Sequence, residues 1–130
     1  MIKVYFAGNK QIFADVNGYT VKTDQAQRAG GDGAYPEPFT VFLASLGTCA
    51  GIYAKSFCDQ REIGTEGMYL TQDQEFDPLR KIIGTVRINI FVNKNFPEKY
   101  DQALISTVGL CAVKRHLRED IDVQVQVQRA

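Results

Sequence analysis

The apolar segment at residues 38–57, PFTVFLASLGTCAGIYAKSF, constrains the fold more than any other part of the chain. It is the longest apolar run in the sequence, and it is long enough for a helix of about five turns. Side chains at steps of three and four residues fall on one face of a helix, and here they are Phe42, Leu46, Cys49, Tyr53 and Phe57. The other faces are nearly as apolar, so the pattern predicts a core helix that is surrounded by protein.

Four residues interrupt this run, namely Ser45, Gly47, Thr48 and Lys55. They make the segment a poor candidate for a transmembrane span, which needs about 20 predominantly apolar residues. Cys49 then lies midway along a packed helix, and we expect any chemistry of the protein to occur there.

The length and charge of the chain narrow the class of protein. A chain of 130 residues predicts one domain, residues 1–130, with its own core. Fifteen basic residues balance fifteen acidic ones, and no basic patch stands out, so no nucleic-acid partner is expected. The first residues lack the apolar core of a signal peptide, which favours a cytoplasmic protein. In that reducing compartment the three cysteines suggest buried thiols, a metal site or redox chemistry.

The first part of the chain predicts a three-stranded antiparallel meander. The Asn17-Gly18 pair is typical of a two-residue hairpin turn, because both positions tolerate positive φ. The expected strands are residues 2–7, 11–16 and 19–23. Residues 24–38 are rich in glycine and proline but lack the Gly-Lys-Ser/Thr of a phosphate-binding loop, so they are interpreted as a flexible connector. Pro38 suits the first turn of the apolar helix, which is expected to run to residue 60 or beyond, with Gly64 as a stop.

The second part predicts a hairpin, a helix and a last strand. Strands are expected at residues 68–75 and 81–93, a turn at Asp77-Pro78, a helix at 97–117 and a half-exposed strand at 121–128. The order of elements is therefore β-β-β-α-β-β-α-β. This order predicts an α+β fold and not a doubly wound parallel sheet.

Two of the cysteines, Cys49 and Cys111, lie on apolar stripes of the two predicted helices. One interpretation is that both are small buried hydrophobic residues, which free cysteines most often are. The other is a redox pair, in which one thiolate attacks an oxidant and the second thiol converts the sulfenic acid to a disulfide. Cys58 is nine helical steps beyond Cys49, about 180° around the helix, and is interpreted as structural.

A metal site is a weaker hypothesis. The chain has no Cys-x-x-Cys motif and a single histidine, His116, five residues after Cys111. Even with Cys49 as a further ligand, this set is weak for a tetrahedral zinc site, so no metal is expected. His116 is interpreted as an exposed residue near the end of the second helix.

A reactive thiol needs a nearby cation to lower its pKa, because burial alone raises it. Arg115 lies one helical turn beyond Cys111, and Arg28 and Lys10 lie in loops that could fold over the helices. Taken singly, each of these cations is better interpreted as a solvated surface charge, and the sequence leaves the role at the thiolate open.

Two short motifs resemble those of a known family. The string Leu43-Ala44-Ser45-Leu46-Gly47-Thr48-Cys49, in a helix opened by Pro38, is similar to the first cysteine motif of the OsmC/Ohr family. This family comprises the osmotically inducible protein C and the organic hydroperoxide resistance proteins. Leu110-Cys111-Ala112-Val113 is similar, more loosely, to the second cysteine motif. The order of predicted elements extends the resemblance over essentially the whole chain.

The resemblance implies an intertwined homodimer, with two central helices wrapped by antiparallel sheet. It implies that Cys49 is the peroxidatic thiol and Cys111 the resolving thiol for a small organic hydroperoxide. The implied reductant is an external dithiol, such as a lipoylated protein, with no metal or flavin cofactor.

The sequence departs from the peroxidase branches of that family. Phe39 and Thr40 occupy the positions where those branches have a glutamate, while Glu37 precedes the proline. The family arginine that holds the thiolate is matched only by Lys10 or Arg28, so the thiolate-stabilising candidates are Arg28, Lys10, Arg115 and Glu37. Ala112 replaces the usual proline after the second cysteine. These features resemble the OsmC-like branch more than the dedicated peroxidases.

The sequence thus predicts an OsmC-like thiol-dependent peroxidase active in oxidative stress defence. Phe39, Phe42 and Tyr53 would bury the tail of an organic peroxide. Two alternatives use the same fold. One is a non-catalytic protein that binds a small ligand, and the other is a thiol-disulfide or sulfur-transfer protein that uses the same cysteines.

Overall fold

The computed structural model describes the chain from residue 1 to 130 except residues 118–121, 123, 125 and 130. The chain forms two compact units, Met1–Thr48 and Cys49–Ala130. Helix α1, Pro38–Gln60, begins in the first unit and ends in the second. Its two ends match the prediction from the sequence.

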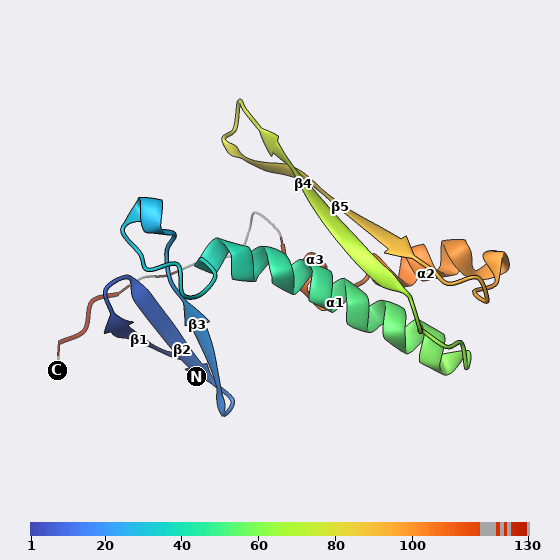
Figure 1. The fold of residues 1–130 in the computed structure, drawn as a ribbon, viewed down its shortest axis with the longest axis horizontal. Helices are drawn as coiled ribbons and strands as arrows, with labels where there is room; N and C mark the ends of the chain where they lie inside the picture. Colours follow the sequence, from blue (N-terminus) through green and yellow to red (C-terminus); the bar gives the residue numbers. More distant parts are fainter. Residues whose placement is uncertain (118–121, 123, 125, 130) are drawn as a thin grey trace. The chain divides into compact units, whose positions relative to one another are not determined.

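The first unit contains an antiparallel meander of three strands in the order β1-β2-β3 (Figure 1). The strands are β1 (Lys3–Gly8), β2 (Gln11–Val16) and β3 (Tyr19–Thr23). Asn17 and Gly18 make the tight turn between β2 and β3 with φ of 49° and 81°. Only a residue pair that tolerates positive φ allows this turn, which is why the hairpin could be predicted from two letters.

The loop between β3 and α1 is held together by a buried carboxylate. Asp24 is 1% exposed, and its side chain accepts hydrogen bonds from the backbone N–H groups of Gln25 (2.7 Å) and Ala34 (3.0 Å). The bond from Ala34 is the main cause that lowers the pKa of Asp24, against the opposing effect of burial. Gly31 is required here, because a Cβ at this position would overlap the carbonyl oxygen of Gln25. The segment is therefore a hydrogen-bonded loop with one 3₁₀ turn, Gln27–Ala29, and not the featureless connector that its composition suggested.

The second unit contains the C-terminal half of α1, a long hairpin and short helices (Figure 1). The hairpin pairs β4 (Tyr69–Asp77) with β5 (Ile82–Phe91), and its register shifts by one residue between Glu75 and Phe76. The Asp77 carboxylate closes the predicted turn by accepting from the backbone N–H groups of Leu79 and Arg80. The mixture of antiparallel sheets and separate helices confirms the predicted α+β class.

The core of the second unit lies where α1 meets the segment of residues 96–108. Its buried members are Ala50, Ala54, Phe57, Cys58, Phe96, Leu104 and Val108. Half-buried apolar residues from the hairpin pack against them, among them Leu70, Ile88 and Ile90. The hairpin thus covers the core with the apolar side of its alternating pattern.

The prediction that α1 is surrounded by protein is wrong for the single chain. Phe39 is 55% exposed, Phe42 is 39% exposed and Ile52 is 57% exposed. The buried stripe runs along Leu46, Ala50, Ala54, Phe57 and Cys58, whereas Cys49 is only half-buried. One chain has too few other elements to cover every side of an apolar helix of 23 residues.

The second predicted helix is broken, which corrects the continuous helix over residues 97–117. The chain forms η2 (Glu98–Tyr100), α2 (Asp101–Val108) and α3 (Ala112–Arg115). Gly109 ends α2, since glycine costs more conformational entropy in a helix than other residues do. The ammonium of Lys114 then donates to the Gly109 carbonyl oxygen at 3.0 Å, which satisfies a free carbonyl at the helix end.

Of the predicted last strand over residues 121–128, residues 121, 123 and 125 lie outside the described residues. The described residues of that stretch, 122, 124 and 126–128, are not in a strand. Among the described residues no strand pairs with them. A half-exposed strand needs a neighbouring strand for its backbone hydrogen bonds, which explains why the alternating pattern alone was insufficient.

One helix of the described residues, α1, is long and apolar enough by length and composition to cross a membrane. Its mean hydropathy is 1.3 over the best window, and 28% of that window is buried in the single chain. The core helix of a soluble protein meets the same criterion, and the polar residues Ser45, Thr48 and Lys55 interrupt this one.

Candidate functional site

The three thiols differ in accessibility. Cys58 is fully buried in the core of the second unit, and burial, followed by the charge of Asp59, raises the pKa of its thiol. Cys111 is 2% exposed, while Cys49 is half-buried. All three are free thiols. A small reagent therefore reaches Cys49 most easily, and Cys58 has the buried position predicted for it.

Cys49 and Cys111 belong to the same compact unit. Ala50, which follows Cys49, and Val108, three residues before Cys111, are members of one core cluster. Cys111 has an extended backbone and precedes α3, and its own N–H donates to the carbonyl oxygen of Val108 at 3.1 Å. It therefore lies in the break after α2 and not within a continuous helix.

Arg115 lies one turn after Cys111, and its backbone N–H donates to the Cys111 carbonyl oxygen at 3.0 Å. The side chain of Arg115 is exposed. Within the described part of the chain, neither the Cys49 sulfur nor the Cys111 sulfur takes part in a hydrogen bond. The cations proposed from the sequence thus have no described bond to either thiol.

The other charged candidates gather at the loop of the first unit. Glu37 accepts a hydrogen bond from the backbone N–H of Ala26 at 3.3 Å, directly before the turn that carries Arg28. The side chain of Lys10 passes beside Gly30, at the end of the same turn. The turn between β1 and β2 that carries Lys10 meets this loop, because the side-chain amide of Asn9 donates to the carbonyl oxygen of Gly30 at 3.0 Å.

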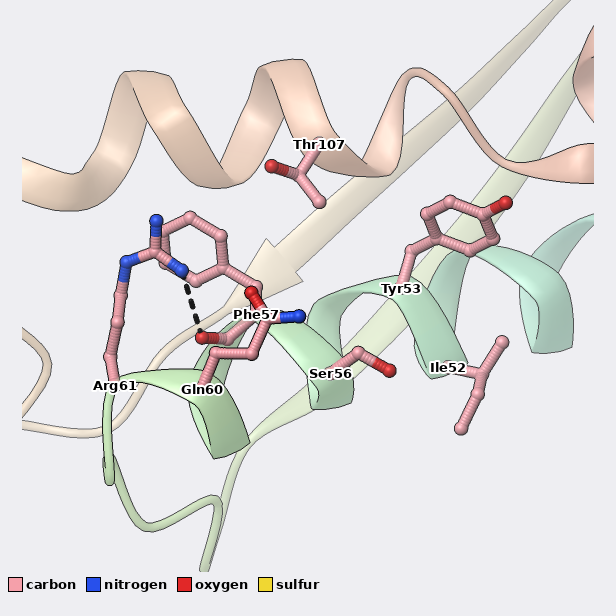
Figure 2. Close-up of a pocket in the computed structure, with 7 residues that line it drawn as sticks. All are labelled: Ile52, Tyr53, Ser56, Phe57, Gln60, Arg61 and Thr107. Carbon is pink, nitrogen blue, oxygen red and sulfur yellow. Dashed lines mark hydrogen bonds between the residues drawn. The ribbon is translucent and has the colours of Figure 1, made fainter.

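The predicted substrate residues fall into two groups. Phe39 and Phe42 stack on each other in the first unit, with ring centroids 5.7 Å apart. Tyr53, in the second unit, lines a cavity of about 320 Å³. Figure 2 shows this cavity, whose other lining residues are Ile52, Ser56, Phe57, Gln60, Arg61 and Thr107.

The sequence of the chain also matches a family model. The model described as OsmC-like protein matches residues 30–126, a stretch that includes both Cys49 and Cys111. The chain belongs to the OsmC-like protein family. The family match therefore spans both compact units of the chain.

Solved structures show the same fold. A protein from Psychrobacter arcticus 273-4, described as an osmotic stress induced and detoxification response protein, has a TM-score of 0.76 at 20% identity, over 92% of this chain and 88% of that one. The organic hydroperoxide resistance protein OsmC of Legionella pneumophila has a TM-score of 0.60 at 16% identity, over 95% of this chain and 92% of that one. The protein OhrB of Bacillus subtilis has a TM-score of 0.55 at 16% identity, over 98% and 96%. At these identities the likeness establishes the OsmC-like fold alone. No curated protein matches the chain.

The sequence did not single out Arg61, Gln60 or Thr107 of this OsmC-like protein as site residues. A usable signal was present, since Arg61 follows Phe57 by four residues at the end of the apolar helix, where the two side chains meet. Among the described residues, no cluster of three or more histidine, cysteine, aspartate or glutamate side chains could hold a metal ion. His116 instead bonds to the Ala112 carbonyl oxygen through Nδ1 at 2.5 Å.

Proposed function

We propose that this OsmC-like protein reduces organic hydroperoxides with Cys49 and Cys111. The observation that carries the proposal is the contrast between the thiols. The half-buried Cys49 and the buried Cys111 lie in one compact unit, and Cys58 alone of the three is a member of the core cluster. Similar folds described as organic hydroperoxide resistance proteins support the same reaction class.

The proposed cycle has three balanced steps. The Cys49 thiolate attacks the distal oxygen of the hydroperoxide and the O–O bond breaks, which leaves an alcohol after protonation and a sulfenic acid on Cys49. The Cys111 thiol then condenses with the sulfenic acid, so that an S–S bond forms and water leaves. An external dithiol exchanges with that disulfide, is itself oxidised, and returns both thiols.

We propose that a cation stabilises the thiolate. The candidates in the first unit are Lys10, in the turn between β1 and β2, and Arg28, in the loop after β3, while Arg115 is the candidate beside Cys111. A cation near a thiol favours the ionised form, which is the nucleophile. Glu37 acts on the loop that carries Arg28, through its bond to the N–H of Ala26.

A second copy of this chain is the proposed partner, in an intertwined homodimer. The support is the apolar surface that one chain leaves uncovered on α1, including Phe39 at 55% and Phe42 at 39% exposed. Exposed apolar patches of this kind mark interaction sites. We further propose a lipoylated protein as the dithiol donor, no bound cofactor, and a cytoplasmic location.

One observation at the thiols favours a function other than peroxide reduction. Neither reactive sulfur has a hydrogen bond among the described residues, and the Glu37 carboxylate already binds a backbone N–H. In a non-catalytic protein that binds a small ligand, the cysteines would be packed and their sulfurs would also have no hydrogen bond. A thiol-disulfide or sulfur-transfer protein would use the same two cysteines without peroxide.

The test is a thiol count before and after one equivalent of cumene hydroperoxide, followed by peptide mapping. The proposal expects rapid loss of two thiols and a linked Cys49–Cys111 peptide. Cys49→Ser should abolish the loss and Cys111→Ser should leave a trapped sulfenic acid, while Cys58→Ser is the matched control and should react normally. Slow oxidation that includes Cys58 would favour the binding protein, and disulfide exchange without peroxide would favour the thiol-disulfide function.

A further inference from the structure

Neither Cys49 nor Cys111 lines the cavity in the second unit, although Tyr53, which the sequence places among the residues for the peroxide tail, does. Six of its seven lining residues come from α1 and the residue after it, and the seventh, Thr107, comes from α2. Its volume of about 320 Å³ is near the lower end for small-molecule sites, about 300 Å³. Its size therefore suits a ligand smaller than a membrane lipid.

One end of the cavity holds a fixed cation. The central carbon of the Arg61 guanidinium lies 3.6 Å from the centroid of the Phe57 ring and 5.4 Å from that of Tyr100. One of its terminal nitrogens donates to the Phe57 carbonyl oxygen at 3.2 Å (Figure 2). This bond also satisfies a free carbonyl at the end of α1, which is the simple structural role of such an arginine.

That structural role leaves most of the guanidinium unused. A guanidinium carries five N–H donors in a planar fork that matches a carboxylate, and one acceptor is described for Arg61. Among the described residues no carboxylate forms an ion pair with it. The stack on Phe57 therefore orients a cation whose remaining donors have no described protein acceptor.

The rest of the cavity changes from polar to apolar along its length. Figure 2 shows Gln60 and Ser56 in the middle, Thr107 opposite them, and Tyr53 with Ile52 at the end away from Arg61. The Thr107 hydroxyl donates to the carbonyl oxygen of Ala103 at 2.8 Å, so its oxygen is free to accept. A ligand with one charged end and one apolar end would match this order of side chains.

We infer that this cavity binds a small organic carboxylate, with its carboxylate on the Arg61 guanidinium and its apolar tail between Tyr53 and Ile52. The planar fork of Arg61 selects a carboxylate over a neutral head group, since charge-assisted bonds are the stronger ones. The limited volume selects a short or medium tail. The test of this site measures binding and does not depend on catalysis.

The test uses octanoate, with octanamide as a neutral probe of nearly the same shape. Binding to the full chain is followed by calorimetry and by the backbone amide NMR signals of Tyr53, Gln60 and Thr107. We expect one site for octanoate, with shifts confined to those signals. Octanamide and the Arg61→Gln variant should each weaken binding about tenfold or more, as expected for a lost charge-assisted bond. Arg61→Lys keeps the charge but not the fork, and should give an intermediate loss.

Lys99→Gln is the matched control, because it removes a cation that also faces Tyr100, at 5.1 Å, but does not line the cavity. It should leave octanoate binding unchanged. Equal weakening in Lys99→Gln and Arg61→Gln would overturn the site in favour of general charge attraction. Equal binding of octanoate and octanamide would overturn it in favour of an apolar groove.

Two further outcomes would also refute the site. No binding at millimolar octanoate refutes it directly. If Arg61→Gln instead changes the sedimentation coefficient and no probe binds, a second copy of the chain fills the cavity. Should Arg61→Gln fail to fold, Arg61→Lys provides the comparison, and unchanged octanoate affinity in Arg61→Lys would contradict the proposal.

Discussion

The stack of Arg61 on Phe57 makes a stability prediction that can be worked out from the structure. Phe57 is 2% exposed, and its ring also contacts Phe96 (centroids 6.4 Å apart) and Tyr100 (6.1 Å, nearly perpendicular). Phe57→Leu keeps a buried apolar side chain of similar size but removes the ring. Two aromatic pairs at about 0.5–1.5 kcal/mol each give an expected loss of about 1–3 kcal/mol in the free energy of unfolding.

A double-mutant cycle that combines Phe57→Leu with Arg61→Met isolates the contribution of the cation–π contact to the free energy of unfolding. Methionine keeps an unbranched stem but has no charge and no donor. Because the Arg61 side chain is exposed, the coupling energy between positions 57 and 61 should be about 0.5–1 kcal/mol and not the larger value of a desolvated site. Urea denaturation of the four proteins, followed by circular dichroism, measures it if the m-values agree.

A cycle between Phe57→Leu and Lys99→Met is the control, since Lys99 faces Tyr100 and has no described contact with Phe57. Its coupling energy should be close to zero. If the Phe57–Arg61 coupling is also zero, the guanidinium does not rest on the ring, and the reasoning that it is preorganised for a carboxylate is wrong.

The remaining predictions concern the core, the loop and the third thiol. Leu104→Ala should lower the free energy of unfolding by about 2–5 kcal/mol, because Leu104 is 2% exposed in the core. Leu79 is 93% exposed, so the control variant Leu79→Ala should change the free energy of unfolding by less than about 0.5 kcal/mol. Similar urea midpoints for the two variants would contradict the core assignment. Cys58→Ala should lower the free energy of unfolding by about 0.5–1.5 kcal/mol, as for the removal of one buried methyl group. The variant should still lose two thiols on reaction with cumene hydroperoxide. A variant that no longer loses two thiols would show that Cys58 takes part in the reaction. The pKa of Asp24 is lowered in the folded state, so its stabilising effect is present above the unfolded pKa of about 3.9 and is lost as pH falls through the folded pKa. Asp24→Asn should therefore destabilise the protein at pH 7 and progressively less below pH 4. Urea denaturation from pH 7 to pH 3 measures the free energy of unfolding of both proteins. A difference between these two free energies that stays constant with pH would refute the prediction.

Local sequence signals predicted the elements that depend on short-range physics. The Asn17-Gly18 pair fixed the second hairpin because its backbone dihedrals suit few other residues, with φ of 49° and 81°. Pro38 and the apolar run gave both ends of α1 correctly, and the Asp77 side chain closes the turn expected at Asp77-Pro78. The cysteine motifs led to the OsmC-like family, which the family match then confirmed.

Other features depend on contacts that a linear pattern does not contain. The break at Gly109 is stabilised by a bond from Lys114, five residues later, so helical periodicity alone extended the second helix too far. Glu37 was a candidate partner for the thiolate, yet its carboxylate binds the N–H of Ala26, eleven residues away in sequence. Asp24 was not singled out at all, since its role is visible only once the loop folds back on it.

The sequence by itself thus determined the hairpins, the long apolar helix, the α+β class and the pair of candidate cysteines, because each rests on local dihedral preference or on the spacing of apolar residues. The tertiary structure alone decided which side of α1 is buried, which thiol is accessible, and which cation faces a cavity. Cys49, Cys58 and Arg61 all lie on or just after one apolar helix. Their different surroundings come from what packs against each side of that helix, and this packing involves residues up to about fifty positions away.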